Sequence, residues 1–289
     1  MVPNQGSGPP WIPPADARDH RAGSRPVNSP TDDHPPATFD TSRPQSARVW
    51  NYWLGGKDYF EVDSEYGDRY VELYPDIVEI ARASRAFLGR AVRHLTGDVG
   101  IRQFLDIGTG LPVTGNTHEV AQSVDPRSRV VYVDNDPLVL AHARALLTGS
   151  PEGATAYLDA DVNDPETILA GAAETLDFSR PIGLILMGIM GNVVDLDEAY
   201  AIVRRFLDAV PSGSHLVLGD GTVADGKVHA LSEGSGGHGY YNRTPQEIAR
   251  YFDGLELLEP GLISTPFWRP APGTTPTALD SFCGVARKA

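Results

Sequence analysis

The first residues with chemical potential form a short turn at 103–110 (QFLDIGTG), where an apolar run ends. Gly108 and Gly110 have no Cβ, so the backbone can turn tightly there and approach a ligand closely. In an open α/β sheet, the first turn from strand to helix is where ligands bind. A dinucleotide fingerprint needs a further glycine three residues after Gly110, where this chain has Val113. The carboxylate of Asp106 would repel a pyrophosphate and attract an ammonium group, so the turn favours a ligand that carries an amine.

Two further acidic sites follow the next two apolar runs. Asp134 ends the run VVYVD and is followed by Asn135. A carboxylate at the tip of a second strand can accept hydrogen bonds from both hydroxyls of a ribose. After the third run, Asp161 could accept from an adenine amino group, and the backbone N–H of Val162 could donate to a ring nitrogen. Asp161 could equally cap the helix that follows, as could Asp164, and both readings stay open.

Together, the three acidic sites describe one ligand with an ammonium group, a ribose and an adenine, and without phosphates. S-adenosylmethionine (SAM) has this composition. We therefore expect SAM as the cofactor and expect no metal ion.

The elements that must position these residues alternate along the chain from residue 101. Apolar runs predict strands at 102–107, 129–134, 154–158, 181–187 and 215–219. Apolar residues at helical spacing predict helices at 113–124, 137–147, 165–175 and 195–209, with Asp195 as the N-cap of the last. A helix at 244–253 and strands near 255–259 and 280–286 complete the chain. This alternation predicts a Rossmann-like α/β fold, with a mostly parallel sheet and helices on both faces.

The composition changes twice upstream of this sheet. Residues 1–45 hold ten of the 24 prolines and few aliphatic residues, so we expect a loosely ordered tail there. Aromatic residues then gather in two short predicted helices, and a longer helix follows at 77–95, which Asp76 caps and Gly97 ends. The sequence thus predicts three parts: the tail 1–45, an N-terminal helical cover 46–98, and a SAM-binding domain 99–289.

Four segments give the chain a resemblance to a known family: SARVWNYWLGGKDYF (46–60), RQFLDIGTGLPVTGNTHEVAQ (102–122), VVYVDNDPLVLAHARALL (130–147) and LELLEPGLISTPFWRP (255–270). Through them, residues 44–288 resemble the class I SAM-dependent methyltransferases, and more closely an actinobacterial family of S-adenosyl methyltransferase-like proteins. The resemblance implies the fold and the cofactor but supplies no methyl acceptor.

Carried over residue by residue, the resemblance implies a set of cofactor-binding positions. These are Asp106, Gly108, Thr109 and Gly110 for the methionine part, Asp134 and Asn135 for the ribose, and Asp161 and Val162 for the adenine. The chain departs from the family pattern at Pro112, where many class I enzymes have a third glycine. The turn after Gly110 must therefore follow another path.

Catalytic residues are less clearly marked. The candidates for a general base are His118, Asp220 and His238. His118 reads either as a surface histidine of its helix or as a contact to cofactor or substrate. His238 lies in a glycine-rich stretch that is either a surface connection or a border of the acceptor pocket.

Residues of the cover are candidates for a lid over the site. Tyr52 and Trp53 belong to its aromatic segment, and Lys57 and Asp58 follow two adjacent glycines that would let the turn move. Arg85 falls on the polar side of the helix at 77–95, where it is either solvated or within reach of a carboxylate in the cleft.

Composition limits the partners. Among 289 residues, 24 are Lys or Arg and 38 are Asp or Glu, for a net charge of −14. Such a chain would be repelled by nucleic-acid backbones and by acidic membrane surfaces. A single cysteine and scattered histidines give no disulfide and no zinc pattern. The chain shows neither a secretory signal nor an apolar run of membrane-spanning length, so we expect a cytoplasmic location.

These observations predict a class I SAM-dependent methyltransferase that acts on a small-molecule acceptor. The reaction would be an in-line displacement at the methyl carbon. Two alternatives remain open: a SAM-binding protein without catalytic activity, and an NAD-dependent oxidoreductase. The oligomeric state is not predicted.

Overall fold

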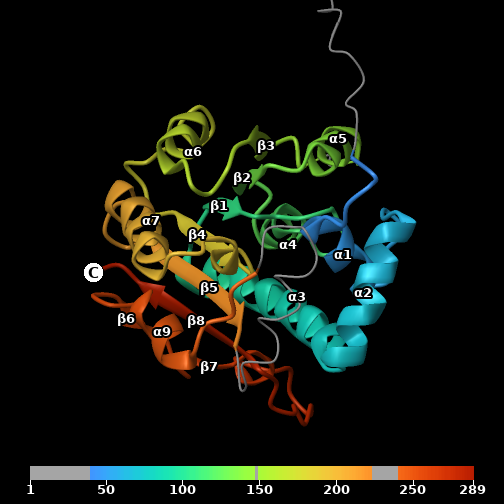
Figure 1. Ribbon diagram of the computed structural model, residues 1–289. Coiled ribbons are helices and arrows are strands. Elements are labelled where there is room, and N and C mark those ends of the chain that lie inside the picture. The colour runs from blue at the N-terminus through green and yellow to red at the C-terminus, as the bar shows by residue number, and fades with distance from the viewer. Residues whose placement is uncertain (1–39, 147–148, 223–239) are drawn as a thin grey trace, which may run out of the picture. The chain divides into compact units, whose positions relative to one another are not determined.

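The protein is built around one central sheet, which is drawn in Figure 1 from a computed structural model that describes residues 40–146, 149–222 and 240–289. Within these ranges the strands lie in the order β3-β2-β1-β4-β5-β8-β6, and β7 pairs with β8. Their bounds are Gln103–Ile107 (β1), Arg129–Asp134 (β2), Ala154–Asp159 (β3), Gly183–Met187 (β4), His215–Gly221 (β5), Glu256–Leu257 (β6), Ile263–Ser264 (β7) and Ser281–Arg287 (β8). β1 to β5 run parallel and β8 is antiparallel to β5. The predicted mostly parallel sheet is confirmed.

Helices cover both faces of this sheet, as predicted (Figure 1). One apolar cluster joins the sheet to α6 (Pro165–Ala172), α7 (Leu196–Ala209) and α9 (Pro245–Arg250). The other joins the opposite face to α3 (Ile77–His94) and α4 (Thr117–Val124). α5 (Pro137–Leu146) connects β2 to β3. Side chains alternate between the two faces, because a strand has a period of two residues.

The strand order reverses between β1 and β4, since β2 and β3 lie on one side of β1, and β4 and β5 on the other. In open α/β sheets, the carboxyl ends of the strands at such a reversal border the ligand-binding crevice. The fold therefore places its binding site where β1 and β2 end.

One predicted helix start and one predicted capping hydrogen bond need correction. The helix expected from residue 113 begins at Thr117, because Asn116 occupies the N-cap position and the Glu119 side chain accepts from its backbone N–H. Asp76 occupies the N-cap position of α3, but its side chain makes no capping hydrogen bond. Asp195, in contrast, accepts from the N–H of Glu198 as predicted.

The end of α3 also differs from the prediction. Gly97 does not end the helix, because a π-helical turn continues it over Leu95–Val99. The reversal comes at Gly100, with φ of 90°, a left-handed conformation that glycine adopts without steric cost. Elsewhere, β5 runs two residues beyond the predicted end at 219.

Upstream of α3 lie α1 (Ser46–Trp53) and α2 (Glu61–Leu73) on either side of the turn that contains Gly55, with φ of 77°. Val49 and Trp53 pack against Ile77, Ile80 and Ala81 of α3. Most of the expected tail lies outside the described residues. Its last residues accept hydrogen bonds, because Arg48 donates to the backbone carbonyls of Asp40 and Arg43.

A buried ion pair fixes α1 on α2. The Nε atom of Arg48 lies 2.9 Å from Oδ2 of Asp63, and the two side chains are 2% and 0% exposed. Asp63 also accepts from the backbone N–H groups of Gln45 and Phe60, so one carboxylate holds the N-terminal ends of both α1 and α2. Among the described residues, none of the helices has the length and apolar character needed to cross a bilayer.

Replacing Asp63 tests this arrangement. Asp63→Ala leaves the buried Arg48 charge uncompensated, which typically costs about 3–5 kcal/mol. We expect urea denaturation to show a loss of this size. Asp68→Ala is the matched control, because Asp68 lies on the same helix, is exposed and accepts from the Tyr52 hydroxyl. Equal stability of the two variants would contradict the role assigned to Asp63.

Candidate active site

The carboxyl ends of the parallel strands open into one cleft of about 620 Å³. It runs from the glycine turn after β1, along the ends of β2 and β4, to the end of β5, and aromatic residues of α1 and α2 form its other wall. Seven aspartates and two arginines line it among the described residues. The cleft therefore favours a ligand with positive charge.

The glycine turn and Asp134 are joined by hydrogen bonds. Gly108 and Gly110 have φ of 76° and 64°, which explains why both positions need glycine. The N–H of Gly110 donates to Oδ2 of Asp134 at 2.9 Å, and the N–H of Asp136 donates to Oδ1 at 3.0 Å. Burial raises the pKa of Asp134 to about 6. Each of its oxygens still has a free lone pair for a ligand hydroxyl.

Asp106 points to the face of the sheet that α3 and α4 cover. Thr117 donates to its Oδ2 at 2.6 Å. Burial raises the pKa of Asp106 to about 6, although the Thr117 hydrogen bond and the charge of Arg85 act in the opposite direction. Its register neighbour is Tyr132, whose ring stacks on Tyr157 with centroids 5.1 Å apart.

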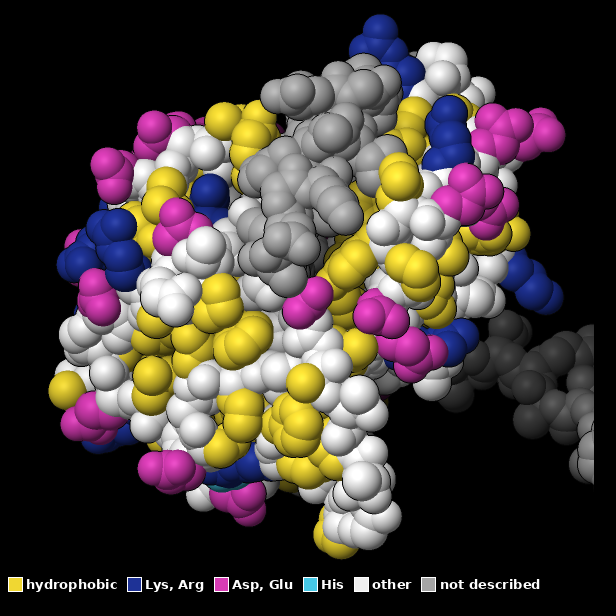
Figure 2. Space-filling view, turned by 60° about the horizontal axis from the view of Figure 1, so that its bottom comes forward, with side chains coloured by type: hydrophobic (Ala, Val, Ile, Leu, Met, Phe, Trp, Pro, Cys, Tyr) yellow, Lys and Arg dark blue, Asp and Glu magenta, His cyan; other side chains and the backbone are white. Residues whose placement is uncertain are grey.

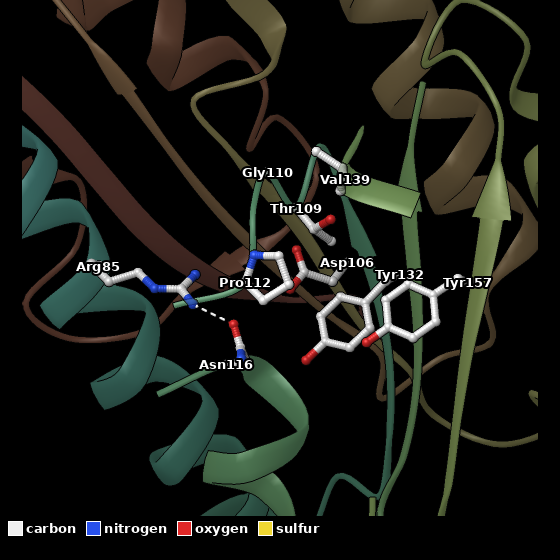
Figure 3. Close-up of a pocket in the computed structure, with 9 residues that line it drawn as sticks. All are labelled: Arg85, Asp106, Thr109, Gly110, Pro112, Asn116, Tyr132, Val139 and Tyr157. Atoms are coloured by element: carbon white, nitrogen blue, oxygen red, sulfur yellow. Dashed lines mark hydrogen bonds between the residues drawn. The ribbon is translucent and has the colours of Figure 1, made fainter. Parts of the chain in front are cut away.

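Arg85 completes a small pocket beside Asp106 (Figure 3). It reaches across from α3, and its Nη2 donates to Oδ1 of Asn116 at 2.8 Å. Its buried Nε has no hydrogen-bond partner in the described part of the chain. A buried guanidinium donor without a partner is costly, and a ligand carboxylate would satisfy it. The expectation that Arg85 comes close to a cleft carboxylate agrees with this position.

The residues after β3 form the far end of the cleft. Oδ2 of Asp161 accepts from Nδ2 of Asn135 at 2.9 Å, which links the tips of β2 and β3. Asp164 accepts from the N–H of Thr167 and is the cap of α6, so the capping reading of Asp161 is not needed. Val162 is buried at the cleft wall.

Two of the five lid candidates line the cleft. Trp53 and Arg85 line the cleft, whereas Tyr52 and Lys57 are not among its lining residues. Asp58 lies 3.3 Å from Nε2 of His142 and so connects the turn to α5.

The three base candidates also separate. His118 is buried rather than on the surface: its backbone N–H and Nδ1 both lie 2.8 Å from the Tyr132 hydroxyl, and it does not line the cleft. Asp220, at the end of β5, is buried and lines the cleft. His238 lies outside the described residues.

Several lining residues escaped the sequence prediction: Trp50, Tyr66, Tyr70, Tyr74, Tyr240, Asn242 and Asp280. The tyrosines at 66, 70 and 74 recur at every fourth position, a spacing that puts them on one helix face and could have identified them. Tyr240, Asn242 and Asp280 carry no local signal, because tertiary contacts such as the hydrogen bond from the N–H of Thr222 to the carbonyl of Asp280 bring them there.

SAM suits these residues on three counts. Asp134 retains acceptor capacity for the ribose hydroxyls, Asp106 faces the pocket where an ammonium group would be stabilised, and Arg85 has a free donor for a carboxylate. In the described residues, no group of three or more acidic, histidine or cysteine side chains could hold a metal ion.

Comparisons with known proteins agree with this fit. Residues 32–289 match the family model described as S-adenosyl methyltransferase. The crystal structure of a DUF574 family protein from Streptomyces avermitilis is 44% identical, with a TM-score of 0.81, covering 86% of this chain and 99% of that one. A candidate methyltransferase from Thermobifida fusca is 42% identical, with a TM-score of 0.79, covering 86% and 96%.

A more distant structure shares the fold alone. Magnesium protoporphyrin IX methyltransferase from Synechocystis is 14% identical, with a TM-score of 0.50, covering 83% of this chain and 93% of that one. No curated protein shows significant similarity to the chain. Because the family model covers most of the chain, the resemblance seen in the sequence is confirmed: the chain belongs to the S-adenosyl methyltransferase family, whose cofactor is SAM.

Proposed function

We propose that this enzyme transfers the methyl group of SAM to a small organic acceptor bound in the aromatic half of the cleft. The observation that carries the proposal is the continuity of the cleft. One cavity joins the glycine turn and Asp134 to the aromatic wall of α1 and α2. Cofactor and acceptor would therefore share one enclosed space, as an in-line displacement requires.

The cofactor would lie along the strand ends. The Asp134 carboxylate would accept from the ribose hydroxyls, and Asp161 and the N–H of Val162 would hold the adenine. Asp106 and Arg85 flank one pocket with opposite charges (Figure 3), which suits the ammonium and carboxylate of the methionine part. When bound, SAM supplies an activated methyl group. The chain's own task is to align the acceptor and exclude water.

A small acceptor is favoured over a nucleic acid by the charge of the protein. The cleft has more aspartates than arginines, and on the face seen in Figure 2 the basic side chains form small separate groups beside acidic ones. A phosphate backbone would be repelled by such a surface. The cytoplasmic location stays a prediction. No observation favours the non-catalytic or NAD-dependent alternatives.

Asp134→Ala tests the cofactor site. The change removes hydrogen bonds from ribose hydroxyls to a charged acceptor, which contribute about 1.5–3 kcal/mol. SAM affinity measured by calorimetry should fall about tenfold or more. Asp159→Ala is the control, because Asp159 pairs with Asp134 in register but is exposed. An unchanged affinity of a folded Asp134→Ala protein would exclude the ribose role, and NADPH binding in place of SAM would overturn the proposed function.

The pH dependence of SAM binding follows from the buried acids. Asp106 and Asp134 have pKa values raised by burial to about 6. A ligand with positive charge and hydroxyl donors stabilises their ionised forms, so binding lowers both pKa values and releases protons. Affinity should therefore rise as the pH increases from about 5 to about 7. Calorimetry in buffers of different ionisation enthalpy should detect proton release near pH 6, and proton uptake there would contradict the assignment.

The cover is predicted to close over the bound cofactor. Ala47 and Phe60 pack against Leu111 and Leu138, beside the glycine turn and the start of α5. SAM should therefore slow hydrogen exchange of amides 50–60, while α7, on the opposite face of the sheet, should be unaffected. If saturating SAM leaves exchange at 50–60 unchanged, the segment is structural packing only.

A further inference from the structure

The half of the cleft beyond the glycine turn has two unlike walls. Trp50, Tyr70 and Tyr74 form the aromatic wall, and Asp220 and Tyr240 come from the opposite side. The turn after β4 lies between them: a Cβ on Gly188 would be 3.7 Å from the Trp50 ring and 3.9 Å from the Tyr240 hydroxyl. We call this space the acceptor chamber. The aromatic side chains that line it suit the binding of a planar ring.

Asp220 stands at the end of this chamber with one oxygen engaged and one free. Oδ1 accepts from the N–H of Gly221 at 2.8 Å and from the Tyr240 hydroxyl. Oδ2 is buried and has no hydrogen-bond partner among the described residues. The residue is 5% exposed. A buried carboxylate oxygen without a partner, on a residue that lines a cleft, can accept a hydrogen bond from a ligand.

The groups around Asp220 shift its pKa in opposite directions. Burial raises its pKa to about 6, and the Tyr240 hydroxyl, the N–H groups of Gly221 and Gly191 and the charge of Arg243 lower it in part. Among the described residues, Tyr251 also interacts electrostatically with Asp220, and its hydroxyl accepts from Nε of Arg243 at 3.2 Å. Tyr240 is itself held in place, because the N–H of Tyr241 donates to the Gly191 carbonyl at 2.7 Å.

We propose that the acceptor is a small phenol without a negative charge, and that Oδ2 of Asp220 receives its hydroxyl proton, with Tyr240 orienting the carboxylate. This rests on the proposed function and names its substrate class. The Tyr240 hydroxyl already shows that a phenol can donate to this carboxylate, from the side of Oδ1. The aspartates of the cleft disfavour an acceptor with its own carboxylate or phosphate.

The step balances without a further reactant. The phenol oxygen forms a bond to the methyl carbon, and the carbon–sulfur bond breaks with its electron pair left on sulfur. The phenol O–H bond breaks as its proton passes to Oδ2 of Asp220, which later releases it to solvent. A base with a pKa near neutrality suits this transfer.

Binding tests the proposal without turnover. The protein saturated with S-adenosylhomocysteine is titrated by calorimetry with 4-methylphenol, 1,4-dimethylbenzene and 4-methylbenzoate, which share one ring and differ in one group. We expect 4-methylphenol to bind most tightly and 4-methylbenzoate most weakly. Asp220→Ala should weaken 4-methylphenol about tenfold or more and leave 1,4-dimethylbenzene unchanged. Equal binding of 4-methylphenol to both proteins, or no preference for it in the wild type, would overturn the proposal.

Turnover measurements provide a second test of the proposal. With SAM saturating across the pH range, so that the pH dependence of SAM binding does not contribute, Asp220→Asn should lower formation of 4-methylanisole by about 10²–10⁴-fold and remove the rise of the rate with pH near 6. Its S-adenosylhomocysteine affinity should stay unchanged, which shows that the variant is folded. Asp253→Asn, an exposed acid outside the cleft, is the matched control. Tyr240→Phe should shift the pH profile without abolishing turnover. Full activity of Asp220→Asn would exclude the base role, whereas failure of the wild type to bind SAM would overturn the proposed function itself.

Discussion

The free-energy cost of burying carboxylates at one edge of the sheet is the constraint on which the site depends. A parallel sheet brings the carboxyl ends of β1, β2 and β5 to the same edge, so Asp106, Asp134 and Asp220 all come to line one cleft. Burial raises the pKa of each to about 6, and Asp106 and Asp134 also repel each other. Hydrogen bonds from backbone N–H groups, Thr117 and Tyr240 offset this cost only in part. A ligand with positive charge and hydroxyl donors removes the remainder, and SAM is such a ligand.

The helical cover turns this edge into an enclosed space. The pair of Arg48 and Asp63 fixes α1 to α2, and their aromatic faces are thereby aimed at the strand ends. In the proposed reaction, enclosure by the cover would strengthen the electrostatic contacts inside the cleft and keep water from the reacting methyl group. The ion pair thus positions the aromatic wall of the cleft, and the carboxylates at the sheet edge line the other wall.

Local pattern in the sequence was enough to predict the five parallel strands and to single out four of the aspartates that line the cleft, Asp106, Asp134, Asp161 and Asp220. Alternating apolar runs located the five parallel strands, and Asp106 and Asp134 stood out as carboxylates at the ends of two such runs. The helix start at Thr117 was missed, because the capping box of Asn116 with Glu119 overrides the apolar periodicity from residue 113. Tyr240 and Asp280 were missed because only long-range contacts near β5 and β8 bring them into the cleft. The predicted helix end at Gly97 was wrong. The helix continues as a π-helical turn up to Gly100, and the burial of Leu95 and Thr96 in this turn cannot be predicted from local helix propensity.

The most direct test of the central claim is a crystal structure with S-adenosylhomocysteine, because it shows which carboxylate meets which part of the ligand. If the buried carboxylates bind this cofactor, Asp134 contacts both ribose hydroxyls, and the amino-acid end of the ligand lies between Asp106 and Arg85. The sulfur then faces the space bordered by Trp50 and Asp220. A ribose bound away from Asp134, or a sulfur turned away from the aromatic wall, would contradict the claim.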